Sequence, residues 1–206
     1  VDQYSADVTI IGAGVAGLAI AAELAGAGRA LYVLEKNDSF GQETSSHNSQ
    51  VIHAGIYYPK GSLKARLCVE GNAMLYDLCP KWGIAYNRLG KLIVAADSEE
   101  TGQLERLRAQ ATENGARDIA MLSGSELRKL EPNVSGVAAL LSPWTGIIDA
   151  YQLMKCFAAK ASDHGAKLVY RSKVTGIGKV NGGYQVDVAD ASGTFSFHTR
   201  VLINSA

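Results

Sequence analysis

The sequence predicts an α/β fold with a parallel sheet, and three observations near its start support this class. An apolar run over 7–11 suits a strand buried on both faces. Glycines spaced as GxGxxG follow it, at Gly12, Gly14 and Gly17. A nearly all-apolar stretch comes next, and a second apolar run over 30–34 ends in an acidic residue, Glu35. This order of strand, glycine-rich turn, helix and strand is typical of a Rossmann-like βαβ unit.

Each part of this unit has a physical task at a bound dinucleotide. Gly12 permits the tight turn, Gly14 lets a pyrophosphate approach the backbone, and Gly17 lets the helix pack closely against the strand. A helix over 15–25 directs its free N–H groups and positive dipole end at the phosphates. Glu35 stands where a carboxylate can accept hydrogen bonds from a ribose. The fingerprint serves both NAD and FAD, and a βαβ unit without any ligand is the alternative.

Composition narrows the class of partner. The chain has 206 residues with 20 acidic and 20 basic side chains, which argues against nucleic acid or a strongly anionic membrane surface as the main partner. No apolar run is long enough to span a bilayer. The cysteines Cys68, Cys79 and Cys156 lack the spacing of a zinc site, so we expect free thiols and no metal. We expect a cytoplasmic protein, with peripheral attachment to the inner membrane left open.

A polar loop is predicted over 41–59. This stretch is dense in hydroxyl, amide and aromatic side chains and follows neither helical nor strand periodicity. A long irregular loop inside a compact domain is usually functional. In this loop, the side chains that could donate hydrogen bonds to phosphate and sugar oxygens are those of Thr44, Ser45, Ser46, Asn48 and Ser49. A solvated surface loop held by Ser and Asn turns is the alternative.

The same region resembles a known family. The run SSHNSQVIHAGIYYP, followed by SLKARLCVEG and later by RLGKLIVA and TGIID, is similar to the L-2-hydroxyglutarate dehydrogenase/oxidase group of the D-amino-acid-oxidase-like (DAO) FAD-dependent oxidoreductases. The resemblance covers nearly the whole chain in consistent order. It implies FAD rather than NAD, a two-domain fold, and oxidation of a small 2-hydroxy acid. The substrate it suggests is L-2-hydroxyglutarate, converted to 2-oxoglutarate by hydride transfer to flavin N5.

The resemblance extends the cofactor site beyond the glycine fingerprint. Related flavoproteins hold the adenine with backbone groups at the position of Val174, and they imply that the 44–55 segment runs along the flavin ring. The predicted FAD-binding residues are therefore Gly12, Gly14, Val15, Ala16, Gly17, Glu35, Lys36, Thr44, Ser45, Ser46, Asn48, Ser49, Gln50, Val51, His53, Val174, Ser205 and Ala206.

His53 is the candidate catalytic residue of this loop. An imidazole titrates near neutral pH and can accept the alcohol proton while the hydride leaves. Two other roles stay open for it. It could donate a hydrogen bond to the flavin, or it could carry a covalent flavin link, because IHAG is similar to the WHxAG of dimethylglycine dehydrogenase. Ile52 replaces the tryptophan of that pattern, which argues against the covalent link.

Four further side chains are candidates for binding the substrate. The hydroxyls of Tyr57 and Tyr58 could reach a carboxylate, and Lys64 and Arg66 are the basic residues near the recognised loop. Both cations lie close to the start of a helix predicted after Ser62, where they oppose the helix dipole, so we consider a further role for them. Aromatic packing between domains and solvent-exposed charge are the alternatives.

The rest of the chain predicts an insert within the dinucleotide-binding fold. We expect residues 1–80 and 149–206 to form the FAD-binding domain, with 81–148 as a smaller mixed substrate domain. A turn at Asn181-Gly182-Gly183 predicts a β-meander before the last parallel strand. That strand, over 200–206, runs into small residues with no closing helix, so we expect the N-terminal part of a longer protein.

Helix boundaries are predicted from caps and from proline. Ser62 is expected to cap a helix that ends at Pro80, and Ser98 is expected to cap the next one. A capping box, Ser123-x-x-Glu126, opens a shorter helix whose Leu127 and Leu130 face inward.

Two other functions stay open at this point. The chain could oxidise an amine or amino acid in the manner of glycine oxidase, or it could be a noncatalytic nucleotide-binding fragment. The electron acceptor of the expected enzyme is undecided among oxygen, a quinone and a carrier protein.

Overall fold

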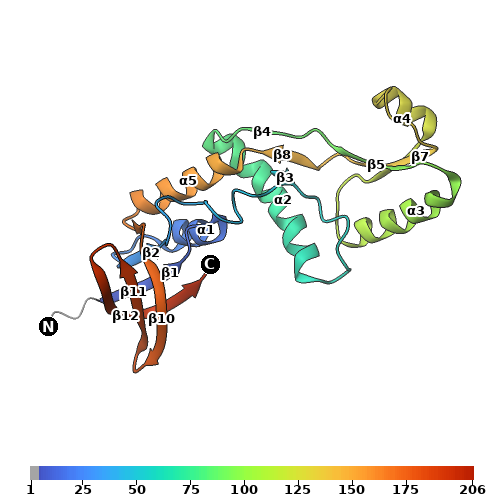
Figure 1. Cartoon of the computed structure of the whole chain (residues 1–206). Coiled ribbons are helices and arrows are strands. Elements are labelled where there is room, and N and C mark those ends of the chain that lie inside the picture. The colour runs from blue at the N-terminus through green and yellow to red at the C-terminus, as the bar shows by residue number, and fades with distance from the viewer. Residues whose placement is uncertain (1–4) are drawn as a thin grey trace. The chain divides into compact units, whose positions relative to one another are not determined.

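A computed structural model describes residues 5–206, which form two compact units (Figure 1). The first unit combines the chain up to Ser49 with Ala150–Ala206, and the second is Gln50–Asp149. The second unit is therefore an insert in the first. The sequence-based boundary at residue 80 differs from this division, because helix α2 (Leu63–Trp82) belongs to the second unit. The extents of the functional domains stay a prediction.

The first unit is organised around a six-stranded mixed sheet with the order β10-β11-β12-β1-β2-β9. Its strands are β1 (Ser5–Ile11), β2 (Leu31–Leu34), β9 (Lys167–Val169), β10 (Lys173–Val180), β11 (Gly183–Asp190) and β12 (Gly193–Asn204). Strands β12, β1, β2 and β9 are parallel, whereas β10, β11 and β12 form an antiparallel meander. The predicted α/β class with a meander is confirmed, and β12 serves as both the last meander strand and the last parallel strand.

Two helices of the first unit, α1 (Val15–Leu24) and α5 (Ala150–Asp163), pack against each other beside this sheet (Figure 1). The core between them and the strands contains the fully buried side chains of Ile10, Leu18 and Val33. Helix α1 is apolar almost throughout, because it contacts both the sheet and α5. This packing fixes the position of the helix start relative to the strand ends.

Register places the fingerprint and the acidic residue at one edge of the sheet. Ile11 pairs with Leu34 of β2 and with Asn204 of β12, each in a parallel ladder. The residues that follow these three, Gly12, Glu35 and Ser205, therefore leave the sheet side by side. Ligands of open parallel sheets bind at this carboxyl edge.

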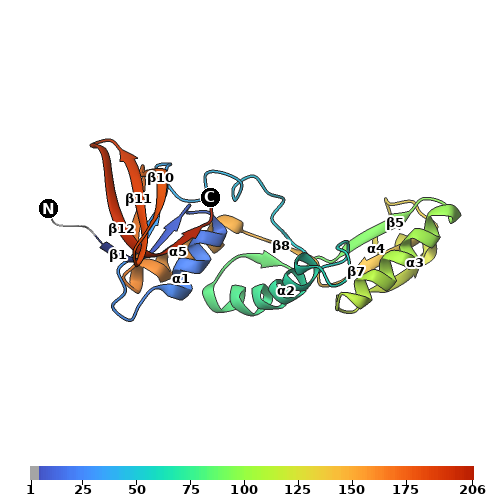
Figure 2. The same ribbon diagram turned by 90° about the horizontal axis from the view of Figure 1, so that it is seen from below.

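The second unit contains two small antiparallel sheets. One has the order β3-β8-β4, from β3 (Val51–Ile52), β8 (Gly146–Ile148) and β4 (Tyr86–Asn87). The other has the order β5-β7-β6, from β5 (Lys91–Ala95), β7 (Ala138–Ser142) and β6 (Ala120–Ser123). Helix α3 (Ser98–Glu113) lies along the second sheet (Figure 2) and buries Leu104 beside Leu140.

The helix caps correct two sequence-based predictions. Ser62 caps α2 as expected, but Pro80 lies inside the helix, which ends only at Gly83 with φ +65°. Proline at this point removes a single hydrogen bond near the helix end, and the left-handed glycine is the stronger stop signal. Helix α3 is capped by Asp97 rather than Ser98, since the Asp97 carboxylate accepts two backbone hydrogen bonds, from Glu99 and Glu100.

The shorter helix α4 (Gly124–Leu130) has the predicted capping box. The Ser123 hydroxyl accepts a hydrogen bond from the Glu126 N–H at 3.3 Å, and the Glu126 carboxylate accepts one from the Ser123 N–H at 2.8 Å. Leu127 is buried as expected, whereas Leu130 is 54% exposed, so its predicted packing is wrong. The helix is only about two turns long, and Leu130, at its end, faces the solvent.

Within residues 5–206, no helix has the length and apolar character needed to cross a membrane. Cys68, Cys79 and Cys156 form no disulfide within residues 5–206. Residues 5–206 contain no group of three or more His, Cys, Asp or Glu side chains suited to a metal ion.

Candidate cofactor and substrate sites

A cavity of about 340 Å³ opens at the carboxyl edge of the first unit's sheet. It brings together residues that are far apart in the sequence but follow neighbouring strands. Nine of the predicted cofactor residues line it: Gly12, Gly14, Glu35, Lys36, Thr44, Ser45, Val174, Ser205 and Ala206. The edge at which parallel strands deliver ligand-binding loops therefore contains a cavity lined by the first two glycines of the fingerprint.

Two glycines of the fingerprint are required by the local geometry. Gly12 has φ +96°, and a Cβ there would lie 2.9 Å from the carbonyl oxygen of Ser205. A Cβ on Gly17 would collide with the carbonyl oxygen of Gly12. Glycine at these positions lets the turn close and lets helix α1 approach the end of β1.

The start of α1 provides donors for an anion. Gly14, the N-cap residue, has no side chain to cap the helix, and the first turn contains no acidic residue. One donor is engaged, since the Val15 N–H donates to the Ser45 hydroxyl at 3.0 Å. The remaining first-turn N–H groups have no partner within the helix, as at any helix start. This donor set fits a diphosphate, with Ser45 already placed at its edge.

Glu35 has a structural task besides the one predicted from the sequence. Its carboxylate is buried, and its two oxygens accept hydrogen bonds from the N–H groups of Ala13 and Asn37, both at 2.9 Å. The carboxylate thus joins the end of β2 to the glycine-rich turn. Each oxygen has two lone pairs, so acceptor capacity is left for a ribose hydroxyl.

The cavity also contains residues that sequence reasoning missed, above all Glu43, Ser172 and Lys173. Glu43 forms an ion pair with Lys36 at 2.9 Å. The hydrogen bond from Lys36 lowers the pKa of the Glu43 carboxyl, and the bond to Glu43 raises the pKa of Lys36. Ser172 and Lys173 directly precede the predicted Val174, which is the signal that could have identified them.

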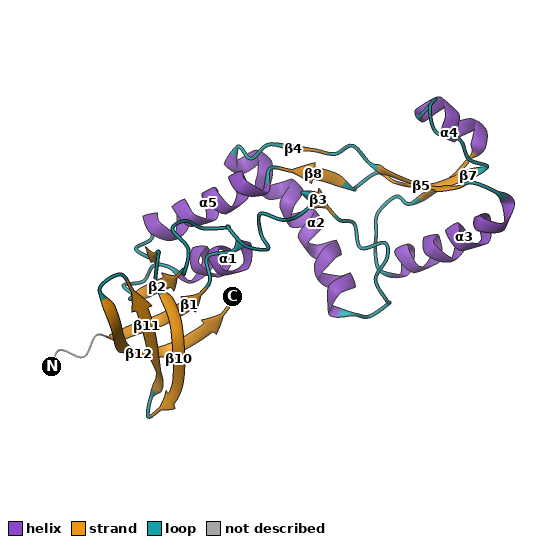
Figure 3. Ribbon diagram, viewed as in Figure 1, coloured by secondary structure: helices purple, strands orange, loops and turns teal. Residues whose placement is uncertain are grey.

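The other predicted cofactor residues lie in three places. Val15, Ala16 and Gly17 form the first turn of α1, whereas Gln50, Val51 and His53 belong to the second unit. The remaining three, Ser46, Asn48 and Ser49, lie in the exposed loop after β2 (Figure 3). Ser46 and Asn48 donate hydrogen bonds to the backbone oxygens of Glu43 and Ser45. These two residues therefore shape the loop itself.

In the second unit, side-chain amides hold the loop that carries His53. The Asn72 amide, on α2, donates to the carbonyl oxygens of His53 at 3.1 Å and Trp144 at 2.8 Å. The Asn114 amide, at the end of α3, donates to Gly55 at 2.9 Å and Tyr58 at 2.8 Å. A further bond runs from Gln110 to the Ile56 carbonyl oxygen, at 3.2 Å. These bonds fix the backbone of residues 53–58 to two helices.

The His53 imidazole is exposed but electrostatically perturbed. Its pKa is lowered from the ordinary value of 6.5, first by loss of hydration and then by the positive charges of Lys91 and Lys64. The neutral ring therefore predominates at pH 7, and its unprotonated nitrogen can accept a proton. Lys91 was not predicted from the sequence.

Three of the four predicted substrate residues, Tyr57, Tyr58 and Lys64, take part in cation–π pairs. The Lys64 ammonium lies 4.6 Å from the centre of the Tyr58 ring, and the Lys91 ammonium lies 4.8 Å from that of Tyr57. Arg66 is instead engaged on the surface of α2, where it pairs with Glu70 at 3.7 Å. Its charge is already balanced, which weakens its case as a substrate ligand.

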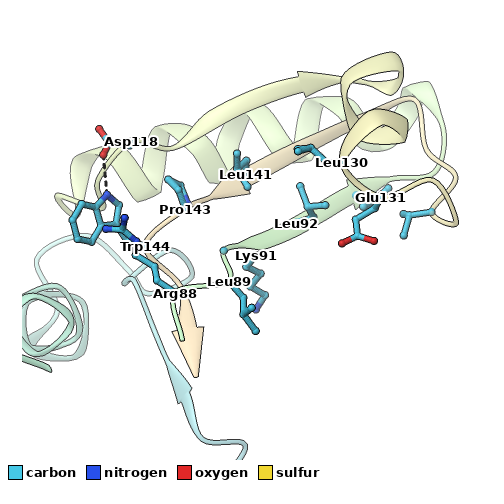
Figure 4. Close-up of a pocket in the computed structure, with 13 residues that line it drawn as sticks. Arg88, Leu89, Lys91, Leu92, Asp118, Leu130, Glu131, Leu141, Pro143 and Trp144 are labelled. Carbon is cyan, nitrogen blue, oxygen red and sulfur yellow. Dashed lines mark hydrogen bonds between the residues drawn. The ribbon is translucent and has the colours of Figure 1, made fainter. Parts of the chain in front are cut away.

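A larger hollow of the second unit, of about 950 Å³, lies over the sheet β5-β7-β6 (Figure 4). Leu92 and Leu141 line it, and at one end the Trp144 indole donates to the Asp118 carboxylate at 2.8 Å. None of the predicted site residues lines it. The predicted cofactor residues gather instead at the smaller cavity of the first unit.

Comparisons with known proteins agree with this geometry. A family model described as DAO, FAD dependent oxidoreductase, matches residues 7–206. L-2-hydroxyglutarate dehydrogenase, mitochondrial, from Arabidopsis thaliana is 42% identical over 196 residues, which are 95% of this chain and 39% of that protein. The protein of the same name from Caenorhabditis elegans is 39% identical over 209 residues, or 100% of this chain and 48% of its own length. This chain thus spans less than half the length of these relatives.

Solved structures give the same fold. L-alpha-glycerophosphate oxidase from Mycoplasma pneumoniae with FAD bound has a TM-score of 0.91 and 33% identity, covering 99% of this chain and 54% of that one. Glycine oxidase from Geobacillus kaustophilus has a TM-score of 0.85 at 24% identity, covering 99% and 56% of the two chains, which supports the fold alone.

Proposed function

This chain belongs to the DAO family of FAD-dependent oxidoreductases, and from that membership we propose that it binds FAD and contributes to the oxidation of L-2-hydroxyglutarate to 2-oxoglutarate. One observation carries the cofactor proposal: Gly12 and Gly14 of the fingerprint and the buried acid Glu35 line one cavity at the carboxyl edge of the parallel strands. The substrate proposal is supported by the names of the relatives at about 40% identity.

Different residues of the cavity would bind different parts of the FAD molecule. Gly14, Val15 and Ser45 would bind the diphosphate, through the helix start and the hydroxyl at its edge. Glu35 would accept hydrogen bonds from the adenosine ribose. Val174 would lie at the adenine, as the family resemblance implies. When bound, FAD supplies the group that accepts a hydride from the substrate.

His53 is the proposed proton acceptor. Its lowered pKa keeps the ring neutral at pH 7, so its unprotonated nitrogen can take the proton of the substrate's C2 hydroxyl. Hydrogen bonds to the loop backbone, from Asn72 and Asn114, hold the residues that carry this ring and the neighbouring tyrosines. The Tyr57 and Tyr58 hydroxyls and the Lys64 ammonium are the proposed contacts for the substrate carboxylates.

Absorbance of the purified complete protein tests both parts of the proposal. We expect bound flavin that is bleached by L-2-hydroxyglutarate under anaerobic conditions and not by L-α-glycerophosphate or glycine. A protein that neither contains nor takes up FAD would contradict the cofactor proposal. Bleaching by another compound of this panel would contradict the substrate proposal alone.

The role of His53 is tested in the same assay. Replacing it by Ala should slow flavin reduction by roughly 10²–10⁴-fold, the usual contribution of a general base. Flavin that stays with acid-precipitated wild-type protein, and is released from the His53→Ala variant, would instead show a covalent link. Unchanged reduction in the variant would remove His53 from the chemistry.

A further inference from the structure

Two lysines of the second unit have positive charges that no carboxylate balances. Lys64 lies in the first turn of α2 and Lys91 begins β5, and neither forms an ion pair within residues 5–206. Nearby cations do: Lys60 pairs with Glu113 at 3.5 Å and Arg66 with Glu70 at 3.7 Å. Lys64 and Lys91 rest instead on aromatic rings, which attract an ammonium group without neutralising it.

Those rings belong to adjacent residues of a fixed loop. Lys64 lies over Tyr58 at 4.6 Å and Lys91 over Tyr57 at 4.8 Å. The Tyr58 carbonyl oxygen accepts a hydrogen bond from the Asn114 amide, and the Ile56 carbonyl oxygen accepts one from the Gln110 amide. Both ammonium groups are therefore attached to one rigid segment, a few residues beyond His53. An ammonium group has three donors, and contact with a ring face leaves donors free for an anion.

We propose that Lys64 and Lys91 form an anion-binding pair that holds the two carboxylates of a dicarboxylic 2-hydroxy acid beside His53. The inference rests on the proposed function and names the residues that select the substrate. It adds Lys91 to the site and leaves Arg66 out. A dicarboxylate supplies the two negative charges that the pair lacks, and a neutral His53 adds no charge of its own.

The two ammonium groups lie over different rings, Lys64 over Tyr58 and Lys91 over Tyr57, so each can bind one carboxylate. The lysine that binds the carboxylate far from the reacting carbon should distinguish dicarboxylic from monocarboxylic substrates. The other lysine should contribute to the binding of both.

The test compares L-2-hydroxyglutarate with L-2-hydroxybutyrate, which lacks the distal carboxylate, in the complete FAD-loaded protein. Lys64→Met and Lys91→Met should each raise KM for the dicarboxylate by about tenfold or more. One of the two variants should leave KM for the monocarboxylate within about twofold, and the other should raise it as well. Calorimetric titration with glutarate gives a second readout, and each variant should weaken glutarate binding without any turnover being needed.

A matched control shows whether the effect comes from losing the charge at this site or from losing any lysine that lies over an aromatic ring. Lys167 lies 5.5 Å from the centre of the Tyr32 ring in the first unit, outside the cavity, and Lys167→Met should leave both KM values within about twofold. Flavin absorbance and thermal unfolding show whether each variant is folded. For a variant that fails to fold, Lys64→Gln or Lys91→Gln replaces it in the comparison.

The outcomes distinguish a failure of the lysine pair from a failure of the proposed function. If the wild-type protein oxidises neither substrate, the proposed function fails. If it oxidises L-2-hydroxyglutarate while Lys64→Met or Lys91→Met keeps its KM for that substrate unchanged, the pair is wrong and the function stands. If both variants raised KM for the two substrates equally, neither lysine would bind the distal carboxylate, and the pair would be wrong.

Discussion

The buried carboxylate of Glu35 accepts a hydrogen bond from the backbone N–H of Ala13 at 2.9 Å. Its other oxygen accepts one from Asn37, also at 2.9 Å. The acid that ends β2 therefore shapes the glycine-rich turn after β1, in addition to its proposed contact with a ribose. The two roles are compatible, because the bonds to the protein leave a lone pair on each oxygen.

Replacing Glu35 by Gln should weaken both the fold and cofactor binding. A side-chain amide has one acceptor oxygen, so one of the two backbone N–H groups would face the NH2 group of the introduced amide and lose its partner. We expect a loss of about 1–3 kcal/mol in the free energy of unfolding and weaker FAD retention. Urea unfolding and FAD titration measure the two effects. Glu23→Gln is the control, since Glu23 forms an exposed pair with Lys160 and should change little.

Two helical glycines should respond in opposite ways to alanine. A Cβ on Gly17 would collide with the carbonyl oxygen of Gly12, so Gly17→Ala should move α1 away from β1 and cost roughly 1–3 kcal/mol. Gly71, inside α2, has open space at its Cβ position, so Gly71→Ala should stabilise by up to about 1 kcal/mol. Thermal unfolding of both variants checks the contrast. Equal stability of the two would show that close packing of α1 is not required.

The pH dependence of flavin reduction should follow the His53 pKa. Because that pKa lies below 6.5 in the folded protein, the neutral base is present at pH 7 and is lost as the pH falls. We expect reduction by L-2-hydroxyglutarate to slow on the acid side, with a midpoint below pH 6.5. Lys91→Met removes a positive charge beside the ring, so its midpoint should move to higher pH. A midpoint at or above pH 6.5 in stopped-flow measurements would contradict the assignment.

Much of the first unit was predictable because its signals are local. The strand, glycines, helix and acid of 7–35 lie in one continuous stretch, and register alone then brings Gly12, Glu35 and Ser205 together. The DAO resemblance, confirmed by the family match over 7–206, rests on runs of contiguous residues as well. The end of α2 was less predictable, since the sequence offers both Pro80 and Gly83 as stops and only the geometry decides between them.

The environment of His53 was hidden from the sequence because its partners come from distant segments. Lys91 begins a strand that only the fold brings near Tyr57. The amides of Asn72 and Asn114 bind backbone oxygens, and any residue type supplies those oxygens, so no pattern marks the pairing. The sequence also does not show which charges are paired. In the structure, Arg66 forms an ion pair with Glu70, whereas Lys64 lies over the Tyr58 ring.

Asn72 should act as a positioning residue for His53. It is buried, and its amide donates to the carbonyl oxygens of His53 and Trp144, at 3.1 and 2.8 Å. Asn72→Ala would leave both oxygens without this donor, and Asn72→Asp would place a carboxylate against them, so Asp should be the worse replacement although it matches Asn in shape. The position of the loop, and with it the rate of flavin reduction, should suffer in the same order.

Flavin reduction and FAD affinity distinguish this role from a general loss of folding. Asn72 lies outside the cavity that contains the glycine fingerprint, so FAD affinity should stay within about twofold while flavin reduction slows by about tenfold or more in Asn72→Ala. Asn133→Ala, at an exposed position, is the matched control and should change neither quantity. If Asn72→Asp reduced flavin as fast as the wild type, the two amide hydrogen bonds would not be what places His53, because a carboxylate cannot donate them.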